Sequence, residues 1–428
     1  MNKTLVLALA FCCFSFSLCS QGFVKRQGDQ FMLNGKPYRY IGTNYWFGTL
    51  LGLEKDPKRG EARLKEELDF LKSNSVTNVR IMVGSEGSGL VNGVRRVQPA
   101  LQTEKGKFDA KNLEGLDLLL SELNKRDMKA VLFISNNWDW SGGFLQYLNW
   151  NGLLPDSILR RKMQWDDMRD IVSKFFTCAG CMEDYRKQLE LVLSRINTVS
   201  GQKYINEPAI MAWQLANEPR PMRPAAVDAY KEWIRSTTAY IKSVDTNHLV
   251  TLGTEGGIGT EGRGNYKDIH NIASVDYLTI HIWPKNWLWF QDTMMHQQMR
   301  TVKKRTKKYI RQHMAIARKL NKPMVIEEFG LPRDNQQYAT STSTTGRDDY
   351  YNYVLSYLTE RKRKMRPLMG INFWAFGGIA RPIPGQIFWK PGDNYMGDPP
   401  MEEQGLNSVF DVDISTWEVI RKHAGRLK

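Results

Sequence analysis

Cysteine is scarce in this sequence of 428 residues, which contains five. Three of them lie among the first 19 residues, so the rest of the chain has only Cys178 and Cys181. A C-x-x-C pair is typical of thiol redox chemistry or of half a zinc site. A second Cys/His pair at metal-ligand spacing is missing, which disfavours zinc. We expect a local disulfide that steadies a turn between a loop and a helix, because export favours oxidation.

Long apolar runs are also lacking. The longest candidate, residues 4–18, follows Lys3 and precedes small residues near Cys19 and Ser20. It is too short for a transmembrane helix but has the layout of a secretory signal peptide. We expect residues 1–20 to be cleaved and the protein to be extracellular or periplasmic, with no membrane span. Lipid anchoring through Cys19 is disfavoured, because Leu18 is unusual before a lipidated cysteine.

Acidic residues are outnumbered, since 60 Lys and Arg and 45 Asp and Glu give a net charge of +15. Much of the excess lies in residues 300–311 and 361–366. A nucleic-acid interface is one interpretation. However, both runs fall within helical apolar patterns and carry no stacking motif of aromatic residues. We therefore expect solvated helix faces and no nucleic-acid partner, with weak attachment to anionic polymers as the alternative.

Apolar and aromatic side chains are abundant: 42% of residues are hydrophobic, with 13 Trp and 17 Tyr. This is enough for one large core or two ordinary domains. No linker, low-complexity tract or charge block divides the chain, so we expect residues 21–428 to form one domain. Flat aromatic side chains are common in sugar-binding clefts, although core packing explains any single tryptophan equally well.

Strand and helix patterns alternate along the whole chain after a small hairpin at residues 31–38. Eight strands, each followed by a helix or a long insertion, predict a (β/α)8 TIM barrel with long loops at the carboxyl ends of its strands. A doubly wound sheet is the alternative, because periodicity does not show whether a sheet closes. The expected strands are residues 39–46, 77–83, 129–136, 210–217, 249–253, 275–283, 323–328 and 369–376. The expected helices are residues 61–74, 112–126, 181–197, 225–244, 293–320, 348–361 and 416–426, and residues 137–150 are expected to be an aromatic loop.

Several of these apolar strands end in residues that suit a ligand site. The carboxyl ends of barrel strands converge on one mouth, where buried polar groups are unfavourable unless they meet one another or a ligand. Two carboxylates facing across a cleft are what glycoside hydrolysis requires, one as proton donor and one as nucleophile. Their separation decides between retention and inversion, and sequence does not supply it. The strand-end residues are Arg80, Asn136, Asn217, Glu218, His281, Glu328 and Trp374.

Two of these strand ends resemble glycoside hydrolase family 5. The motifs are Asn217-Glu218-Pro219 on the fourth strand and Glu328-Phe329-Gly330 on the seventh. Residues 42–46, 136–138, 214–218 and 281–284 are most similar to its endo-β-1,4-mannanase branch. The resemblance implies a retaining enzyme that hydrolyses β-1,4 bonds inside mannan, galactomannan or glucomannan. It implies neither a cofactor nor a metal, and we expect a monomer.

The resemblance also implies roles for individual residues. Glu218 matches the general acid/base and Glu328 the nucleophile. Glu327 is the rival nucleophile, disfavoured because strand alternation would point adjacent side chains to opposite sides. Arg80 would hydrogen-bond the nucleophile, Asn217 would hold the sugar's 2-hydroxyl, and Trp374 would lie beneath the sugar. The full set of expected substrate-binding residues is Arg80, Asn136, Trp138, Asn217, His281, Trp283 and Trp374.

One position departs from the pattern of the family. Many members have a tyrosine two residues beyond the strand-six histidine, and its hydroxyl bonds the nucleophile. This chain has Trp283 there, which donates only through its indole nitrogen. Either the nitrogen replaces the hydroxyl, or the ring has become a stacking wall.

Three alternatives compete with this interpretation. Residues 257–262 spell G-x-G-x-x-G after a strand, but residues 263–268 do not predict the helix of a dinucleotide site, so we expect a loop there. An endo-β-1,4-glucanase of the same family would have the same catalytic residues. A barrel that only binds polysaccharide would be expected to lack one of the two carboxylates.

Overall fold

The computed structural model describes residues 22–359 and 365–427. The predicted signal peptide, including Cys19, lies outside the described residues. The centre of the molecule is a sheet of eight parallel strands in the order β12-β11-β10-β5-β4-β15-β14-β13, and every residue in these strands is buried. The strands are β4 (Tyr40–Asn44), β5 (Asn78–Met82), β10 (Lys129–Asn136), β11 (Ile210–Asn217), β12 (Leu249–Thr251), β13 (Leu278–Ile282), β14 (Met324–Phe329) and β15 (Leu368–Phe373).

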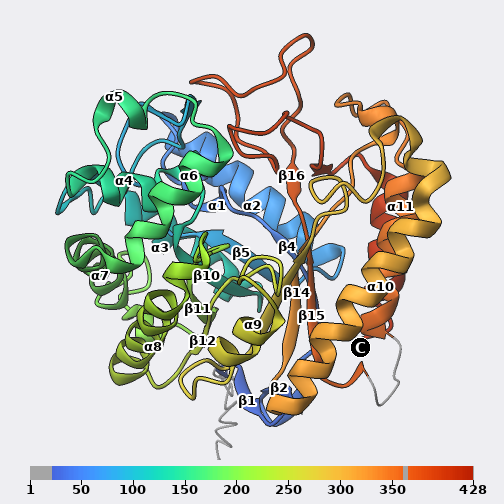
Figure 1. Ribbon diagram of the computed structural model, residues 1–428. Helices are drawn as coiled ribbons and strands as arrows, with labels where there is room; N and C mark the ends of the chain where they lie inside the picture. Colours follow the sequence, from blue (N-terminus) through green and yellow to red (C-terminus); the bar gives the residue numbers. More distant parts are fainter. Residues whose placement is uncertain (1–21, 360–364, 428) are drawn as a thin grey trace, which may run out of the picture.

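The sheet closes on itself between β12 and β13, where a few separate hydrogen bonds replace a regular ladder. The Asp276 N–H donates to Val250 O at 2.8 Å, and the His281 N–H donates to Glu255 O at 3.1 Å. The Thr251 hydroxyl donates to Tyr277 O at 3.0 Å. The predicted (β/α)8 barrel is therefore confirmed over the doubly wound alternative (Figure 1).

Helices surround this barrel, and at least one follows each strand (Figure 1). The principal helices are α2 (Pro57–Ser73), α3 (Asn112–Lys125), α7 (Ala179–Leu193), α8 (Val227–Val244), α9 (Arg263–His270), α10 (Met295–Leu320), α11 (Thr345–Thr359) and α12 (Ile414–Ala424). α10 buries Val302 and Ile310 and exposes Lys304 and Lys308. The basic run at residues 300–311 is thus a solvated helix face, as predicted; the run at 361–366 lies partly outside the described residues.

A small antiparallel sheet lies below the barrel, at the amino ends of its strands (Figure 1). It consists of β1 (Lys25–Gln27), β2 (Gln30–Leu33) and β3 (Lys36–Pro37). Asn34 and Gly35 at the predicted hairpin turn both have positive φ, 51° and 75°, which a type I′ turn requires. Phe31 of β2 is fully buried and packs edge-on against Tyr277, so the hairpin closes this end of the core.

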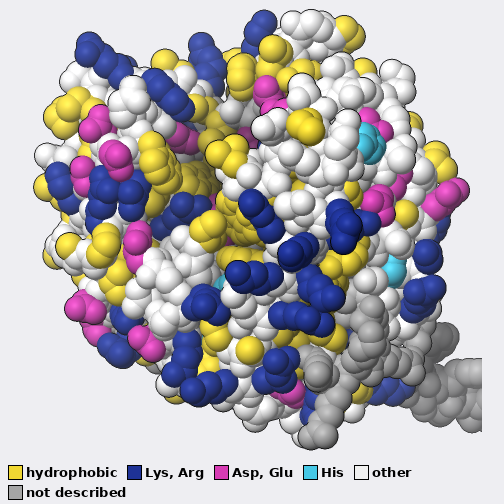
Figure 2. Space-filling view, turned by 45° about the vertical axis from the view of Figure 1, so that its right-hand side comes forward, with side chains coloured by type: hydrophobic (Ala, Val, Ile, Leu, Met, Phe, Trp, Pro, Cys, Tyr) yellow, Lys and Arg dark blue, Asp and Glu magenta, His cyan; other side chains and the backbone are white. Residues whose placement is uncertain are grey.

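Long insertions rise at the opposite end, where the strands finish (Figure 1). After β10 the chain forms α4 (Gly143–Trp150), α5 (Asp156–Leu159) and α6 (Trp165–Val172), and residues 379–408 form a loop between β16 (Phe376–Gly378) and β17 (Val409–Phe410). Figure 2 shows a hollow with largely hydrophobic walls. The remaining short elements are α1 (Gly48–Leu51), β6 (Leu90–Val91), β7 (Val94–Arg95), β8 (Gln102–Glu104) and β9 (Lys107–Phe108). None of the helices in the described ranges is long and apolar enough to cross a membrane.

One predicted loop is helical, while residues 257–262 form the predicted loop and are followed directly by a helix. Residues 137–150 contain a 3-10 turn at Asp139–Ser141 and then α4, whose Phe144 and Leu148 are fully buried. Phe144 and Tyr147 serve core packing, while Trp138 is only partly buried, and the loop prediction was wrong. α9 starts directly after Gly262, although its sequence is polar, because Tyr266 and Ile269 pack into the core.

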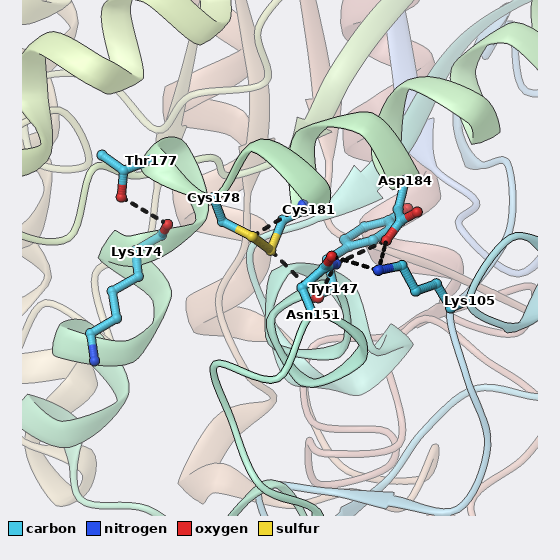
Figure 3. The surroundings of a disulfide bond; sticks show 8 residues. All are labelled: Lys105, Tyr147, Asn151, Lys174, Thr177, Cys178, Cys181 and Asp184. Atoms are coloured by element: carbon cyan, nitrogen blue, oxygen red, sulfur yellow. Dashed lines mark hydrogen bonds and ion pairs between the residues drawn. A yellow bond between two sulfur atoms is a disulfide. The ribbon is translucent and has the colours of Figure 1, made fainter.

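Cys178 and Cys181 form the predicted disulfide at the start of α7 (Figure 3). The Cys181 sulfur lies 3.5 Å from the carbonyl oxygen of Tyr147 in α4. Asn151, at the end of α4, donates from Nδ2 both to that oxygen and to Asp184 of α7, at 2.9 Å in each case. The bridge therefore belongs to a contact that holds α7 against α4.

Candidate active site

Arg80 on β5 organises the centre of the barrel mouth. Its side chain is fully buried, and a buried guanidinium is stable only when its N–H groups meet acceptors. The acceptors are side-chain oxygens: Glu328 Oε1 at 2.5 Å, Gln214 Oε1 and Asn217 Oδ1 at 2.8 Å, and Asn44 Oδ1 at 3.0 Å. Arg80 thereby fixes residues of the first, fourth and seventh strands relative to one another.

Glu328 lies in β14, and different groups bind its two oxygens. Oε1 accepts from Arg80, and Oε2 accepts from the indole N–H of Trp283 at 3.0 Å. The Trp283 ring also packs edge-on against Trp374, with ring centres 5.8 Å apart. The indole nitrogen thus reaches the carboxylate, as expected if it replaces the hydroxyl of the family's tyrosine.

Glu218 follows β11 in an unusual backbone conformation. Its φ is 49°, the left-handed region that non-glycine residues rarely adopt and that is concentrated at functional sites. Its Oε2 accepts from the indole N–H of Trp138 at 2.6 Å, and its Oε1 lies 2.6 Å from His281 Nδ1. The carboxylate is therefore held from β10 and from β13.

Glu218 and Glu328 face each other beside His281. One oxygen of each carboxylate and one nitrogen of the histidine lie within 4.8 Å of one another. Retaining glycosidases have carboxyl groups about 5–5.5 Å apart, and inverting ones about 6.5–9.5 Å. Two carboxylates whose oxygens approach within 4.8 Å are compatible with the closer, retaining spacing. In the described part of the chain these three residues are also the one group that could hold a metal ion, but the adjacent Arg80 charge opposes a bound cation.

His281 lies between the carboxylates. Burial acts to lower its pKa, but the charge of Glu328 and the hydrogen bonds with Glu218 and Glu327 raise the pKa well above the ordinary value. The imidazole is therefore protonated at neutral pH, and it balances part of the negative charge of the site.

Glu327 also belongs to this network, so the prediction that its side chain points away from the site was wrong. Ile280 pairs with Ile326 and His281 with Glu328, which makes Glu327 an extra residue in the ladder; such bulges re-aim side chains. Gln214 Nε2 lies 2.8 and 2.7 Å from its two oxygens. Burial acts to raise the pKa of Glu327, but Arg80 and His281 hold it below the ordinary value.

Known proteins are similar to this chain in sequence and in fold. A family model described as GH family 5 beta-mannosidase-like matches residues 21–428. The chain belongs to glycoside hydrolase family 5. It is 30% identical over 424 residues to mannan endo-1,4-beta-mannosidase 7 of Arabidopsis thaliana, over 96% of this chain and 86% of that one.

Solved structures agree with this membership. The crystal structure of a glycoside hydrolase family 5 mannosidase from Rhizomucor miehei superposes with a TM-score of 0.83 at 29% identity, covering 95% of this chain and 97% of that chain. An endo-beta-1,4-mannanase from Thermotoga petrophila has the same fold, with a TM-score of 0.65 at 23% identity over 92% and 77% of the two chains.

The remaining predicted residues of this family 5 hydrolase lie at the same mouth. Asn136 is fully buried, and its Oδ1 accepts from Trp138 N at 3.0 Å and from Asn217 Nδ2 at 3.1 Å. It therefore positions two other predicted residues. Trp374 is 4% exposed, and its indole N–H has no hydrogen-bond partner among the residues described. Sugar binding by these residues stays a prediction.

Sequence reasoning missed an ion pair beside Glu218. Arg220 pairs with Glu255, which follows β12, and its guanidinium lies 4.9 Å from the centre of the Trp138 ring. Trp165 of α6, half exposed, stacks on the same ring at 6.1 Å. Glu255 could have been found, because it follows the fifth strand in the way that other predicted residues follow theirs. Trp165 had no comparable signal.

Proposed function

We propose that this family 5 hydrolase cleaves β-1,4-mannosidic bonds inside mannan, galactomannan or glucomannan with retention of anomeric configuration. The observation that carries the proposal is the pair Glu218 and Glu328, with oxygens within 4.8 Å of each other at the barrel mouth. The choice of mannan is supported by the Arabidopsis relative, which is described as a mannan endo-1,4-beta-mannosidase.

In the proposed mechanism Glu328 attacks the anomeric carbon while Glu218 protonates the departing oxygen. Water, deprotonated by Glu218 acting as base, then hydrolyses the glycosyl-enzyme and releases the sugar. Arg80 and Trp283 orient the nucleophile, and Trp138 and His281 orient the acid/base. Glu328 thus supplies the attack, Glu218 supplies both proton transfers, and the other four side chains hold them in place.

A second candidate is the removal of single mannosyl units from chain ends. It is favoured by the close superposition on the structure of a family 5 mannosidase, with a TM-score of 0.83. The two candidates share the catalytic residues and differ in the products that they release.

Product analysis tests these proposals. The full-length protein is incubated with mannan, galactomannan, glucomannan and cellulose, the products are sized, and the first anomer is identified by NMR. Internal cleavage predicts a rapid fall in the viscosity of mannan solutions and oligosaccharides in the β configuration. Release of mannose alone would favour the second candidate, hydrolysis of cellulose without mannan would favour a glucanase, and a first product in the α configuration would overturn retention.

We also propose that the protein is exported and acts as a monomer. The apolar leader at residues 4–18 and the Cys178–Cys181 bridge support an oxidising compartment. Terminal sequencing of exported protein should find a start near residue 21, and gel filtration should give the mass of one chain. Retention of residues 1–20 in exported protein would contradict cleavage.

A further inference from the structure

A third carboxyl group lies near the catalytic pair and has no part in the mechanism above. Glu402 belongs to the loop 379–408, which rises over the barrel at the top of Figure 1. The residue is partly exposed, but its Oε2 atom is buried and has no hydrogen-bond partner within the described residues. A buried carboxyl oxygen without a partner is unfavourable, so a ligand hydroxyl that bonded this atom would be stabilising.

The backbone that carries Glu402 is held rigidly from within the loop. Gln404 Nε2 donates to the carbonyl oxygens of Asp398 and Glu402, at 3.0 and 3.1 Å. The Asp398 carboxylate accepts from the N–H groups of Gly405 and Ser408, at 3.0 and 3.1 Å. The position of Glu402 therefore does not depend on a bound substrate.

The loop is anchored at the end of β15. The indole N–H of Trp46 donates to Gly397 O at 2.9 Å, and the Val409 N–H donates to Ala375 O at 2.8 Å. Ala375 follows Trp374, the predicted platform beneath the sugar. In the barrel β15 is the neighbour of β14, which carries Glu328, and lies opposite β11, which leads to Glu218. In the proposed mechanism Glu218 protonates the leaving group, which would place the loop on the glycone side of the scissile bond.

The carboxylates of the candidate active site also affect the pKa of Glu402. Burial raises the pKa of its carboxyl well above the ordinary value, and the neighbouring Asp398, Glu328 and Glu218 raise it further. These effects favour the neutral acid. A neutral carboxyl both donates and accepts a hydrogen bond, which suits a sugar hydroxyl.

We propose that Glu402 binds a hydroxyl group of the mannosyl unit on the glycone side of the scissile bond. The inference rests on the proposed function for the identity of the sugar. Glu402 is thus a substrate-binding residue, supplied by the loop after the eighth strand and recognising the part of the substrate that Glu328 attacks.

Steady-state kinetics on an aryl β-mannoside and on mannotriose test the proposal. Glu402→Ala and Glu402→Met should raise KM about tenfold or more, because neither side chain hydrogen-bonds a hydroxyl well. Glu402→Gln should stay within about threefold of wild type, because an amide, like the neutral acid, both donates and accepts. The matched control is Glu403→Met, since the charge of Glu403 acts on Tyr338 of another loop; it should leave KM within about twofold.

The outcomes separate this inference from the proposed function. If wild type hydrolyses no mannoside, the proposed function fails, and the same variants are measured on the polysaccharide that it does hydrolyse. If wild type is active and Glu402→Met keeps its KM, the role of Glu402 is wrong; an equal loss in Glu403→Met would likewise overturn it. The methionine variant preserves side-chain length, so the test stands even where the alanine variant does not fold.

Discussion

The two sides of the catalytic cleft hold their carboxylates with different kinds of neighbour. On the β14 side, Glu328 contacts the buried guanidinium of Arg80. On the β11 side, Glu218 contacts Trp138 and His281, and the guanidinium of nearby Arg220 is paired with Glu255 instead. A guanidinium that stays charged suits a group that attacks as an anion, whereas an indole N–H and an imidazolium that can give up its proton suit a group that gives and takes a proton. The surroundings thus distinguish two glutamates that look alike in the sequence.

The largest effects should come from removing the carboxylates themselves. Glu328→Gln should lower kcat/KM by about 10⁴-fold on both mannan and an aryl β-mannoside, because attack needs a carboxylate whatever the leaving group. Glu218→Gln should lower it by about 10²–10⁴-fold on mannan and far less on the aryl mannoside, whose leaving group needs little protonation. Equal sensitivity of the two variants to the leaving group would contradict the assignment.

Smaller effects should follow from removing one indole hydrogen bond on each side. A hydrogen bond to a charged group is worth about 1.5–3 kcal/mol, or roughly 10–100-fold in rate. Trp283→Phe should slow the hydrolysis of both substrates equally, because the lost hydrogen bond is to Glu328. Trp138→Phe should slow the hydrolysis of mannan more than that of the aryl mannoside, because the lost hydrogen bond is to Glu218. Trp287→Phe is the control: this tryptophan packs on Trp289 and Tyr309, so its kinetics should match wild type.

The smallest effect on catalysis is expected from Glu86, whose carboxylate contacts residues of β10 and α4. Its carboxylate accepts from Ser135 Oγ at 2.8 Å and from the N–H of Gly143 in α4 at 3.0 Å. Burial raises its pKa from 4.5 to about 7. The protonated group therefore contributes stability that is fully present below pH 4.5 and lost as pH rises to about 7, at most roughly 3 kcal/mol.

Glu86→Gln removes that dependence on pH. Relative to wild type, the free energy of unfolding of the variant should rise by roughly 2–3 kcal/mol between pH 4.5 and pH 8, and kcat should change little. Denaturant titrations at the two pH values measure the difference. A constant difference would mean that Glu86 does not titrate in this range.

The positions of the proposed catalytic residues could be predicted because they depend on a repeating architecture. Once eight strands are counted, the end of each strand has a known place at the mouth, and this brings Arg80, Glu218, His281 and Glu328 together. Side chains stop alternating between the two faces of a strand where its pairing with the neighbouring strand contains an extra residue. The contacts of Glu327 in β14 therefore could not be predicted. A bulge depends on pairing between strands and leaves no mark in one strand's own pattern.

Residues outside the strands were harder to predict. α9 is polar and is stabilised by tertiary contacts of Tyr266 and Ile269 rather than by an apolar periodicity. Glu402 lies in a loop without periodicity, and only the folded chain brings it to the catalytic pair. The sequence therefore predicts the position of the proposed catalytic residues better than that of the proposed substrate-binding residue Glu402.

The hydrogen bond from Trp283 to Glu328 has a consequence for work in alkaline solution. A tyrosine in this place would lose its proton near pH 10, and its oxygen would then repel the nucleophile. An indole N–H keeps its proton over that whole range. Glu328 therefore keeps this donor at high pH, and any loss of rate there must start at another group, with the imidazolium of His281 the first to examine.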